Sequence, residues 1–221
     1  MTGAATAPFL GVLMLATRFP RPPGDVGHPA SWSMPVRWRV VAGASPDRVV
    51  RQADAGLLQA FIDTASALVD EGAAAITTSC GFLVRHQAAL QAAVRVPVWT
   101  SSLLLLPALA RPGVVTVDAR AFDTGLLVAA GAAPDIPVEG LAPGCRLQRT
   151  LLEDLPELDA AEAEAQTVAA AVRLCERDPG LTDLVLECTN LPPYADAVRR
   201  ATGRPVHHLL TLVHERWKAL A

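Results

Sequence analysis

Two cysteines, Cys80 and Cys188, occupy equivalent places in two similar stretches of the sequence. Each follows a short apolar run typical of a β-strand, at residues 73–78 and 182–187, and each precedes a segment typical of a helix. A cysteine thiolate is a base and a nucleophile, and the first N–H groups of a helix stabilise a nearby negative charge. Two thiols facing one cleft could remove a proton from one face of a carbon atom and return one to the other face. We therefore expect both cysteines to be catalytic.

Small polar residues and a glycine flank both cysteines and are candidates for binding the substrate. They are Thr78, Ser79, Gly81, Thr189 and Asn190. Backbone N–H groups at the start of a helix can hold a carboxylate, and binding it there makes the adjacent C–H bond more acidic. Glycine also lets the backbone approach a ligand closely. These residues predict a small-molecule carboxylate as the substrate.

Strand-like and helix-like segments alternate along nearly the whole chain, which is the pattern of a parallel sheet covered by helices. The predicted strands are residues 9–15, 37–42, 73–78, 96–100, 113–118, 136–140, 182–187 and 204–208. The predicted helices are residues 54–71, 82–94, 102–110, 120–131, 159–177, 193–202 and 209–220. Because the strand–cysteine–helix unit occurs twice, we predict an α/β fold of two pseudo-symmetric lobes. Each lobe is a mostly parallel sheet flanked by helices, and the site lies in the cleft between them.

Two irregular stretches, residues 16–35 and 143–158, interrupt this alternation. The first leaves the end of the first strand, where ligands of open α/β sheets bind, and loops of this length commonly serve a binding site. Arg18 in this loop could pair with a second carboxylate of the substrate, although a plain surface arginine is an equal alternative. The sequence leaves open whether the loop is solvent-covered, closes over a ligand or packs against a second subunit of a homodimer.

Composition and charge exclude several classes of partner. Hydrophobic residues make up 51% of the 221 residues and charged residues 19%, which favours a folded chain with a large core. The formal net charge is -3 and no basic block occurs, so we expect no nucleic-acid partner. No apolar run reaches the roughly 18 residues that cross a bilayer, so we expect no membrane association.

The remaining sequence features bear on cofactors and on location. The four cysteines, at positions 80, 145, 175 and 188, show no CxxC spacing and no nearby pair of histidines, so we expect no metal site. Neither GxGxxG nor a P-loop occurs, which counts against a nucleotide cofactor, and we expect an enzyme without cofactors. A core of this size does not need disulfides, so we predict reduced thiols and a cytoplasmic location.

The stretches Thr77-Thr78-Ser79-Cys80-Gly81 and Glu187-Cys188-Thr189-Asn190 resemble the two cysteine motifs of the aspartate/glutamate racemase superfamily. That group includes amino-acid racemases, hydantoin racemases, maleate isomerases and arylmalonate decarboxylases. The resemblance implies a cofactor-independent isomerase in which the two cysteines exchange the roles of acid and base in a 1,1-proton transfer. It also implies a first lobe at residues 1–98 and a second at 99–207, with a C-terminal helix at 208–221 that returns to the first lobe.

One departure from the family pattern leaves other functions open. Amino-acid racemases commonly have Glu or His two residues after the second cysteine, whereas this chain has Asn190, which cannot titrate. Help for Cys188 would then come from Glu187 or His207. One alternative keeps the fold but uses a single cysteine as a covalent nucleophile in an isomerase, decarboxylase or hydrolase. A second alternative is a non-catalytic protein that binds a small ligand.

Overall fold

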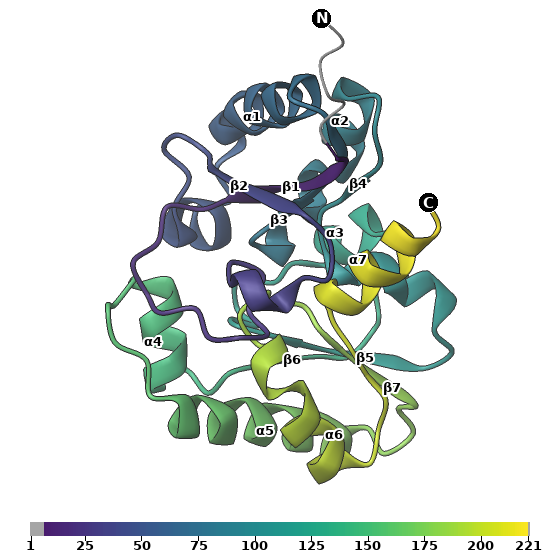
Figure 1. The fold of residues 1–221 in the computed structure, drawn as a ribbon. Coiled ribbons are helices and arrows are strands. Elements are labelled where there is room, and N and C mark those ends of the chain that lie inside the picture. The colour runs from purple at the N-terminus through teal and green to yellow at the C-terminus, as the bar shows by residue number, and fades with distance from the viewer. Residues whose placement is uncertain (1–6, 221) are drawn as a thin grey trace, which may run out of the picture.

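The structure is a computed structural model and describes residues 7–220. The predicted lobe limits at residues 1 and 221 lie outside the described residues. Figure 1 shows two sheets, one above the other, with helices on their outer sides. No helix among the described residues is long and apolar enough to cross a membrane.

The two sheets have the same strand order and all their strand pairs are parallel. The first has the order β2-β1-β3-β4, with β1 (Phe9–Met14), β2 (Val36–Val40), β3 (Ala73–Thr78) and β4 (Val98–Trp99). The second has the order β6-β5-β7-β8, with β5 (Pro112–Thr116), β6 (Val138–Gly140), β7 (Asp183–Leu186) and β8 (Val206–His207). This arrangement confirms the predicted α/β fold with two pseudo-symmetric halves.

Helices connect the strands, because a parallel strand pair needs a crossover. The α-helices are α1 (Leu58–Asp70), α2 (Gln87–Ala93), α3 (Thr124–Ala129), α4 (Arg146–Leu152), α5 (Ala160–Arg177), α6 (Ala195–Thr202) and α7 (Leu209–Lys218). Shorter helical turns are η1 (Pro29–Ser31), η2 (Asp47–Arg51), η3 (Ala55–Leu57), η4 (Gly81–His86), η5 (Ser102–Ala108) and η6 (Pro192–Tyr194). In Figure 1, α1 and α2 lie above the first sheet, and α5 and α6 lie below the second.

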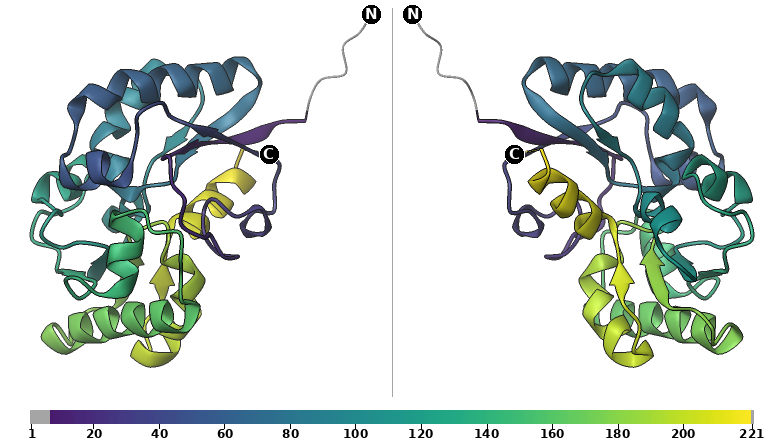
Figure 2. Two further views of the ribbon diagram at one scale, coloured as in Figure 1. Left: turned by 90° about the vertical axis from the view of Figure 1, so that its left-hand side faces the viewer. Right: turned by 90° about the vertical axis from the view of Figure 1, so that its right-hand side faces the viewer.

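Strand β1 shows how the sequence builds the first sheet. Its six residues are all buried, because the strand is paired on both sides and covered on both faces. Side chains alternate between the faces, so Leu10 and Val12 join the buried cluster that contains Leu209 and Val213 of α7. Phe9 and Leu13 join the larger core, which includes α1. The C-terminal helix therefore packs on the first sheet, and Figure 2 shows α7 in yellow beside β1.

Two predicted segments differ from the structure. Residues 143–158, predicted as irregular, contain α4, whose buried Leu147 and Leu151 are four residues apart on one face. The helix was missed because Pro143, Gly144 and Pro156, which are typical of irregular segments, lie close to it in the sequence. The predicted helix at 102–110 is the 3-10 helix η5, which has Pro107 inside it.

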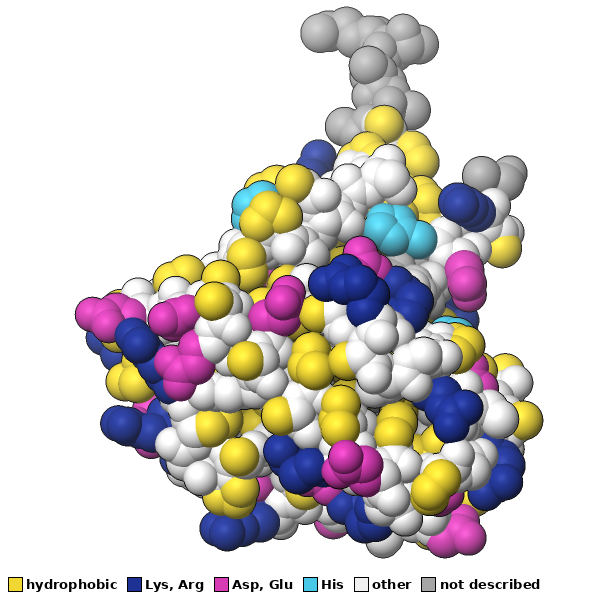
Figure 3. All heavy atoms as spheres, turned by 90° about the horizontal axis from the view of Figure 1, so that it is seen from below, with side chains coloured by type: hydrophobic (Ala, Val, Ile, Leu, Met, Phe, Trp, Pro, Cys, Tyr) yellow, Lys and Arg dark blue, Asp and Glu magenta, His cyan; other side chains and the backbone are white. Residues whose placement is uncertain are grey.

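Charges on the surface are mixed in sign. On the face seen from below in Figure 3, Lys and Arg side chains are interspersed with Asp and Glu, without one large area of a single sign.

The lobes touch at the ends of β3 and β7, and Gly81 makes this contact possible. A Cβ atom at Gly81 would lie 2.4 Å from the carbonyl oxygen of Glu187 and 2.2 Å from its Oε1. The carbonyl belongs to the backbone, so it cannot move aside without moving β7. The absence of a side chain at Gly81 therefore sets how closely the two lobes approach.

We expect Gly81→Ala to lower the free energy of unfolding by about 1–3 kcal/mol, because it overpacks a buried contact between lobes. Gly125→Ala in α3 is the control: its Cβ would meet only the exposed carboxylate of Asp123, which can rotate away. That variant should be neutral or more stable by up to about 1 kcal/mol. Urea denaturation measures both, and equal stability of the two variants would contradict the role of Gly81.

Candidate active site

The carboxyl ends of β3 and β7 meet at a pocket between the two sheets. Cys80 and Cys188 both line this pocket, and their residues are only 8% and 7% exposed. About half of the lining residues are aliphatic or aromatic, and they include Phe82 and Leu151. The structure thus brings the two predicted catalytic thiols together, one from each lobe.

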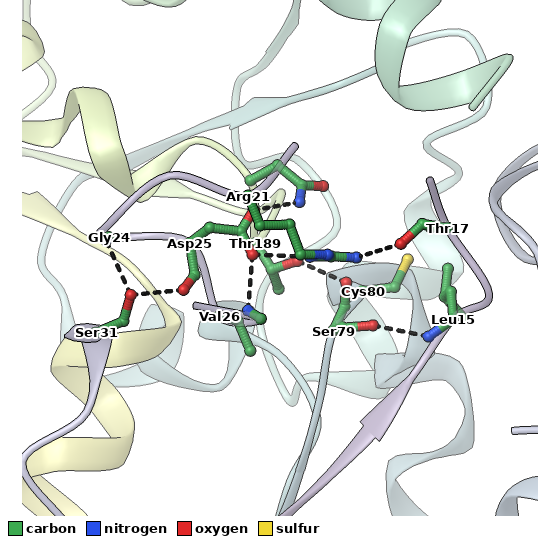
Figure 4. Close-up of polar contacts among 12 residues, drawn as sticks. Leu15, Thr17, Arg21, Gly24, Asp25, Val26, Ser31, Ser79, Cys80 and Thr189 are labelled. Carbon is green, nitrogen blue, oxygen red and sulfur yellow. Dashed lines mark hydrogen bonds and ion pairs between the residues drawn. The ribbon is translucent and has the colours of Figure 1, made fainter. Parts of the chain in front are cut away.

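Hydrogen bonds hold in place the loop after β3, which carries Cys80, and the loop after β7, which carries Cys188. The Thr189 hydroxyl donates to the Ser79 carbonyl at 2.6 Å, and the Ser79 hydroxyl accepts the Leu15 N–H at 2.9 Å. Figure 4 shows both bonds near Cys80. Ser79 and Thr189, both predicted to bind the substrate, line the pocket, but their hydroxyl groups are already hydrogen-bonded to backbone atoms. The N–H groups of Gly81 and Thr189, two residues of the pocket wall, have no acceptor within residues 7–220 and are therefore candidates for binding a ligand.

Burial of Cys80 outweighs the help that its helix terminus gives. We expected the helix start to favour the thiolate, yet burial, reinforced by the charge of Glu187, raises the pKa of Cys80 to about 12. The Phe82 N–H and the guanidinium groups of Arg85 and Arg21 oppose this rise in the pKa. Cys80 is therefore a thiol at rest, with two cations placed to stabilise its thiolate.

Cys188 has less support for its thiolate. Burial, then the charge of Glu187, raises its pKa well above the ordinary value, and Asp25 adds to the rise. The Asn190 amide donates from Nδ2 to Asp25 at 2.6 Å, which turns its Oδ1 toward the Cys188 sulfur at 3.5 Å. A carbonyl oxygen there accepts from the thiol and favours the protonated form.

Glu187 is the third acidic group of the pocket. It is fully buried, its Oε2 accepts a hydrogen bond from the Thr116 hydroxyl at 2.7 Å, and its Oε1 has no partner among the described residues. Burial raises the pKa of Glu187 to about 7, against the lowering effect of Thr116. From the sequence we considered Glu187 only as one of two residues that could assist Cys188. Its position directly after the apolar strand Leu184-Val185-Leu186 was a signal that this carboxylate lies at the site.

Loop 16–35 forms one wall of the pocket and fastens the two lobes together. Thr17, Phe19 and Arg21 line the pocket, and Arg21 reaches between the Asp25 carboxylate at 2.7 Å and the Thr17 hydroxyl at 2.9 Å (Figure 4). Asp25 is 1% exposed and also accepts from Asn190 of the second lobe. In Figure 1 the loop descends from β1 to the level of the second sheet.

The structure does not bring Arg18, Thr78 or His207 to the pocket. Arg18 is 72% exposed and pairs with Asp154, because irregular backbone turns it outward. The Thr78 hydroxyl donates to the Thr100 carbonyl at 2.7 Å and is sealed beneath the site. His207 lies 2.9 Å from Asp183, at the opposite end of β7 from Glu187. The arginine at the pocket is Arg21, for which the sequence offered no signal beyond its place in the same loop.

The described residues contain no cluster of side chains suited to bind a metal ion. Residues 7–220 contain no group of three or more His, Cys, Asp or Glu side chains arranged to hold an ion. The Cys145 and Cys175 thiols are partly buried, unpaired with any other cysteine and not part of the pocket wall.

We expect Asp25→Ala to lower the free energy of unfolding by about 3–5 kcal/mol, because it leaves the guanidinium of Arg21, only 12% exposed, without its carboxylate. Arg18→Ala is the matched control in the same loop. It removes an exposed pair and should cost about 1 kcal/mol or less. Thermal or urea unfolding distinguishes the two, and a small effect of Asp25→Ala would mean that the loop does not fasten the lobes.

Known proteins similar in sequence to this chain include several lyases. The chain is 34% identical to dimethylsulfoniopropionate lyase 3 of Emiliania huxleyi over 236 aligned positions, which cover 94% of the chain and 58% of that relative. It is 31% identical to lyase 7 of the same organism, covering 92% and 64%, and 29% identical to a dimethylsulfoniopropionate lyase of Durusdinium sp. clade D, covering 90% and 70%. The chain thus spans only 58% of the length of the first relative. No protein-family model matches the chain.

Solved structures with the same fold include racemases and a decarboxylase. Allantoin racemase from Klebsiella pneumoniae superposes with a TM-score of 0.66 at 14% identity, covering 97% of this chain and 87% of that one. Unliganded arylmalonate decarboxylase gives 0.61 at 19% identity, covering 97% and 93%. An aspartate racemase homologue from Pyrococcus horikoshii gives 0.54 at 14% identity, covering 96% and 97%. The chain therefore has the fold of these racemases and of arylmalonate decarboxylase, which is the fold that its two cysteine motifs predicted.

Proposed function

We propose that this protein is a lyase that removes a proton next to a carboxylate and expels a leaving group from the following carbon. Its proposed substrate is dimethylsulfoniopropionate or a close relative of that compound. The observation that carries the proposal is a pair of buried thiols sharing one pocket with an arginine, in a chain 34% identical to a dimethylsulfoniopropionate lyase. A lyase shares its first step, proton removal next to a carboxylate, with the racemase reaction implied by the fold.

The proposed reaction is a β-elimination. A thiolate takes a proton from the carbon next to the carboxylate, and the electrons of that C–H bond form a carbon–carbon double bond. The bond between the next carbon and the sulfonium sulfur breaks, and its electrons leave with the sulfur. The products are acrylate, neutral dimethyl sulfide and a thiol that carries the removed proton.

The asymmetry between the two cysteines supports different roles for them. Cys80 has the guanidinium groups of Arg21 and Arg85 nearby to stabilise a thiolate, whereas Cys188 faces the Asn190 carbonyl and the charge of Asp25. We therefore assign Cys80 as the base. Cys188 remains a thiol that can donate a hydrogen bond to the substrate from the other lobe.

The pocket suits both ends of such a substrate. The free N–H groups of Gly81 and Thr189 can receive the carboxylate, where charge accumulates as the proton leaves. A dimethylsulfonium group is an apolar cation, which suits the apolar wall and the ring of Phe82. Arg21 adds positive charge on the loop side of the pocket and favours a carboxylate there.

A racemase or epimerase reaction is the second candidate. The observation that favours it is that the two thiols come from pseudo-symmetric strand ends, so each could serve one face of a carbon atom. In that reaction both cysteines are equally necessary. The asymmetry of their surroundings favours the lyase instead.

We expect Cys80→Ser to lower the rate of acrylate release from dimethylsulfoniopropionate by about 10²–10⁴-fold, since it removes the base. Cys188→Ser should lower the rate less, and Cys175→Ser, on α5 outside the pocket, should leave it unchanged. Chromatography of acrylate measures all three rates. A larger loss for Cys188→Ser than for Cys80→Ser would reverse the assignment of the base.

Incubation in D₂O separates the two candidate functions. With dimethylsulfoniopropionate, the lyase gives equal amounts of acrylate and dimethyl sulfide from the wild-type protein. A racemase would instead incorporate deuterium next to the carboxylate of a chiral amino acid or hydroxy acid, invert its configuration and form no alkene. Inversion without elimination across a panel of such acids would replace the lyase by the second candidate.

A further inference from the structure

The buried carboxyl group of Glu187 has an oxygen atom without a hydrogen-bond partner among residues 7–220. The side chain is fully buried, and its Oε2 is held by the Thr116 hydroxyl at 2.7 Å, yet Oε1 receives no hydrogen bond within the described chain. A buried carboxyl oxygen without a donor is unfavourable, so its retention calls for an explanation. The same residue lines the pocket with both thiols.

The position of Oε1 is fixed between the two cysteine loops. The ideal Cβ position of Gly81, the residue after Cys80, lies 2.2 Å from this oxygen. On its other side, Glu187 is bonded directly to Cys188. The carboxyl is therefore adjacent to the loops that carry Cys80 and Cys188, where Gly81 contacts Glu187.

We propose that Glu187 is a third catalytic residue, which exchanges protons with the two cysteines inside the pocket. This inference rests on the proposed function and deepens it. At rest Cys80 is a thiol, and Glu187 as a carboxylate takes its proton when the substrate binds, which forms the thiolate base. The elimination then leaves the substrate's proton on Cys80, and Glu187 releases the proton it holds when the product leaves.

The charges around Glu187 support a role in proton transfer. The groups that ionise or carry charge around Glu187 and the two thiols are Cys80 at the end of β3, Cys188 in the loop of Glu187, Arg85 of η4, which acts on Cys80, and Arg21 and Asp25 of loop 16–35, which act on Cys80 and Cys188. The charge of Glu187 raises the pKa of both thiols, so a proton moved from a thiol to Glu187 removes that repulsion. The thiolate then forms beside a neutral acid, without an added negative charge in the pocket.

The sign of the pH dependence follows from the base role. Burial raises the pKa of Glu187 to about 7, so the carboxylate is lost as the pH falls through that value. Acrylate release should fall below about pH 7 in the wild type. Thr116→Val removes a donor that lowers this pKa, so the fall in activity should begin at a higher pH.

The test compares the wild type with Glu187→Gln, Glu187→Asp and Thr116→Val. We expect Glu187→Gln to lower turnover by about 10²–10⁴-fold and to abolish the acid limb of the pH profile. Glu187→Asp should restore part of the turnover because it keeps a carboxylate. Turnover of Glu187→Gln within threefold of the wild type, or an unchanged acid limb, would overturn the proposal.

A second readout does not depend on the lyase reaction. Alkylation of Cys80 and Cys188 by iodoacetamide, followed site by site by mass spectrometry, should become faster in Glu187→Gln, because the repelling charge is gone. In the wild type the alkylation profile should show an inflection near pH 7 that Glu187→Gln lacks. If no substrate is cleaved but these changes in alkylation occur, the lyase assignment fails and the coupling of Glu187 to the thiols stands. If dimethylsulfoniopropionate is cleaved and Glu187→Gln changes the alkylation rate of neither thiol, the lyase assignment stands and only the proposed role of Glu187 is wrong.

Discussion

The contact between the carboxyl ends of β3 and β7 is the constraint on which the site depends. Two parallel sheets present their loops to one another there, and the loops approach so closely that only glycine fits at position 81. The bond from the Thr189 hydroxyl to the Ser79 carbonyl, at 2.6 Å, joins the lobes, and the bond from the Ser102 hydroxyl to the Leu186 carbonyl, at 2.8 Å, ties the segment after β4 to the end of β7. Because buried backbone groups need partners, these bonds fix the distance between the two thiol loops.

That contact also determines the electrostatics of the pocket. It buries three acidic groups, Cys80, Glu187 and Cys188, in one apolar space, and burial disfavours the charged form of each. The resting site is consequently poor in charge, and an approaching carboxylate meets thiols rather than thiolates. The cost of forming a thiolate is offset by Arg21, Arg85 and helix N–H groups, whose positions differ between the two lobes.

Loop 16–35 converts a symmetric frame into an asymmetric site. The two lobes repeat the same strand order, yet this loop belongs only to the first lobe and reaches the second through Asp25 and Asn190. Through Asp25 it turns the Asn190 carbonyl toward Cys188, and through Arg21 it brings a positive charge to the pocket that favours the Cys80 thiolate. A pseudo-symmetric pair of cysteines thereby acquires two different chemical environments.

The sequence by itself determined the fold and the two thiols, because period and composition are local signals. Buried parallel strands are continuous apolar runs, and a cysteine directly after such a run lies at the carboxyl edge of a sheet wherever the sheet is placed. The same reasoning missed α4, since its short apolar face lies between prolines and a glycine.

Only the tertiary structure decided which side chains complete the pocket. Arg18 and Arg21 are three residues apart in irregular backbone, where no periodicity predicts the direction of a side chain. Arg18 pairs with Asp154 on the surface, whereas Arg21 pairs with Asp25 at the pocket. The unpaired oxygen of Glu187 and the high pKa of both thiols likewise arise from burial between lobes, which is a property of packing that no stretch of sequence contains.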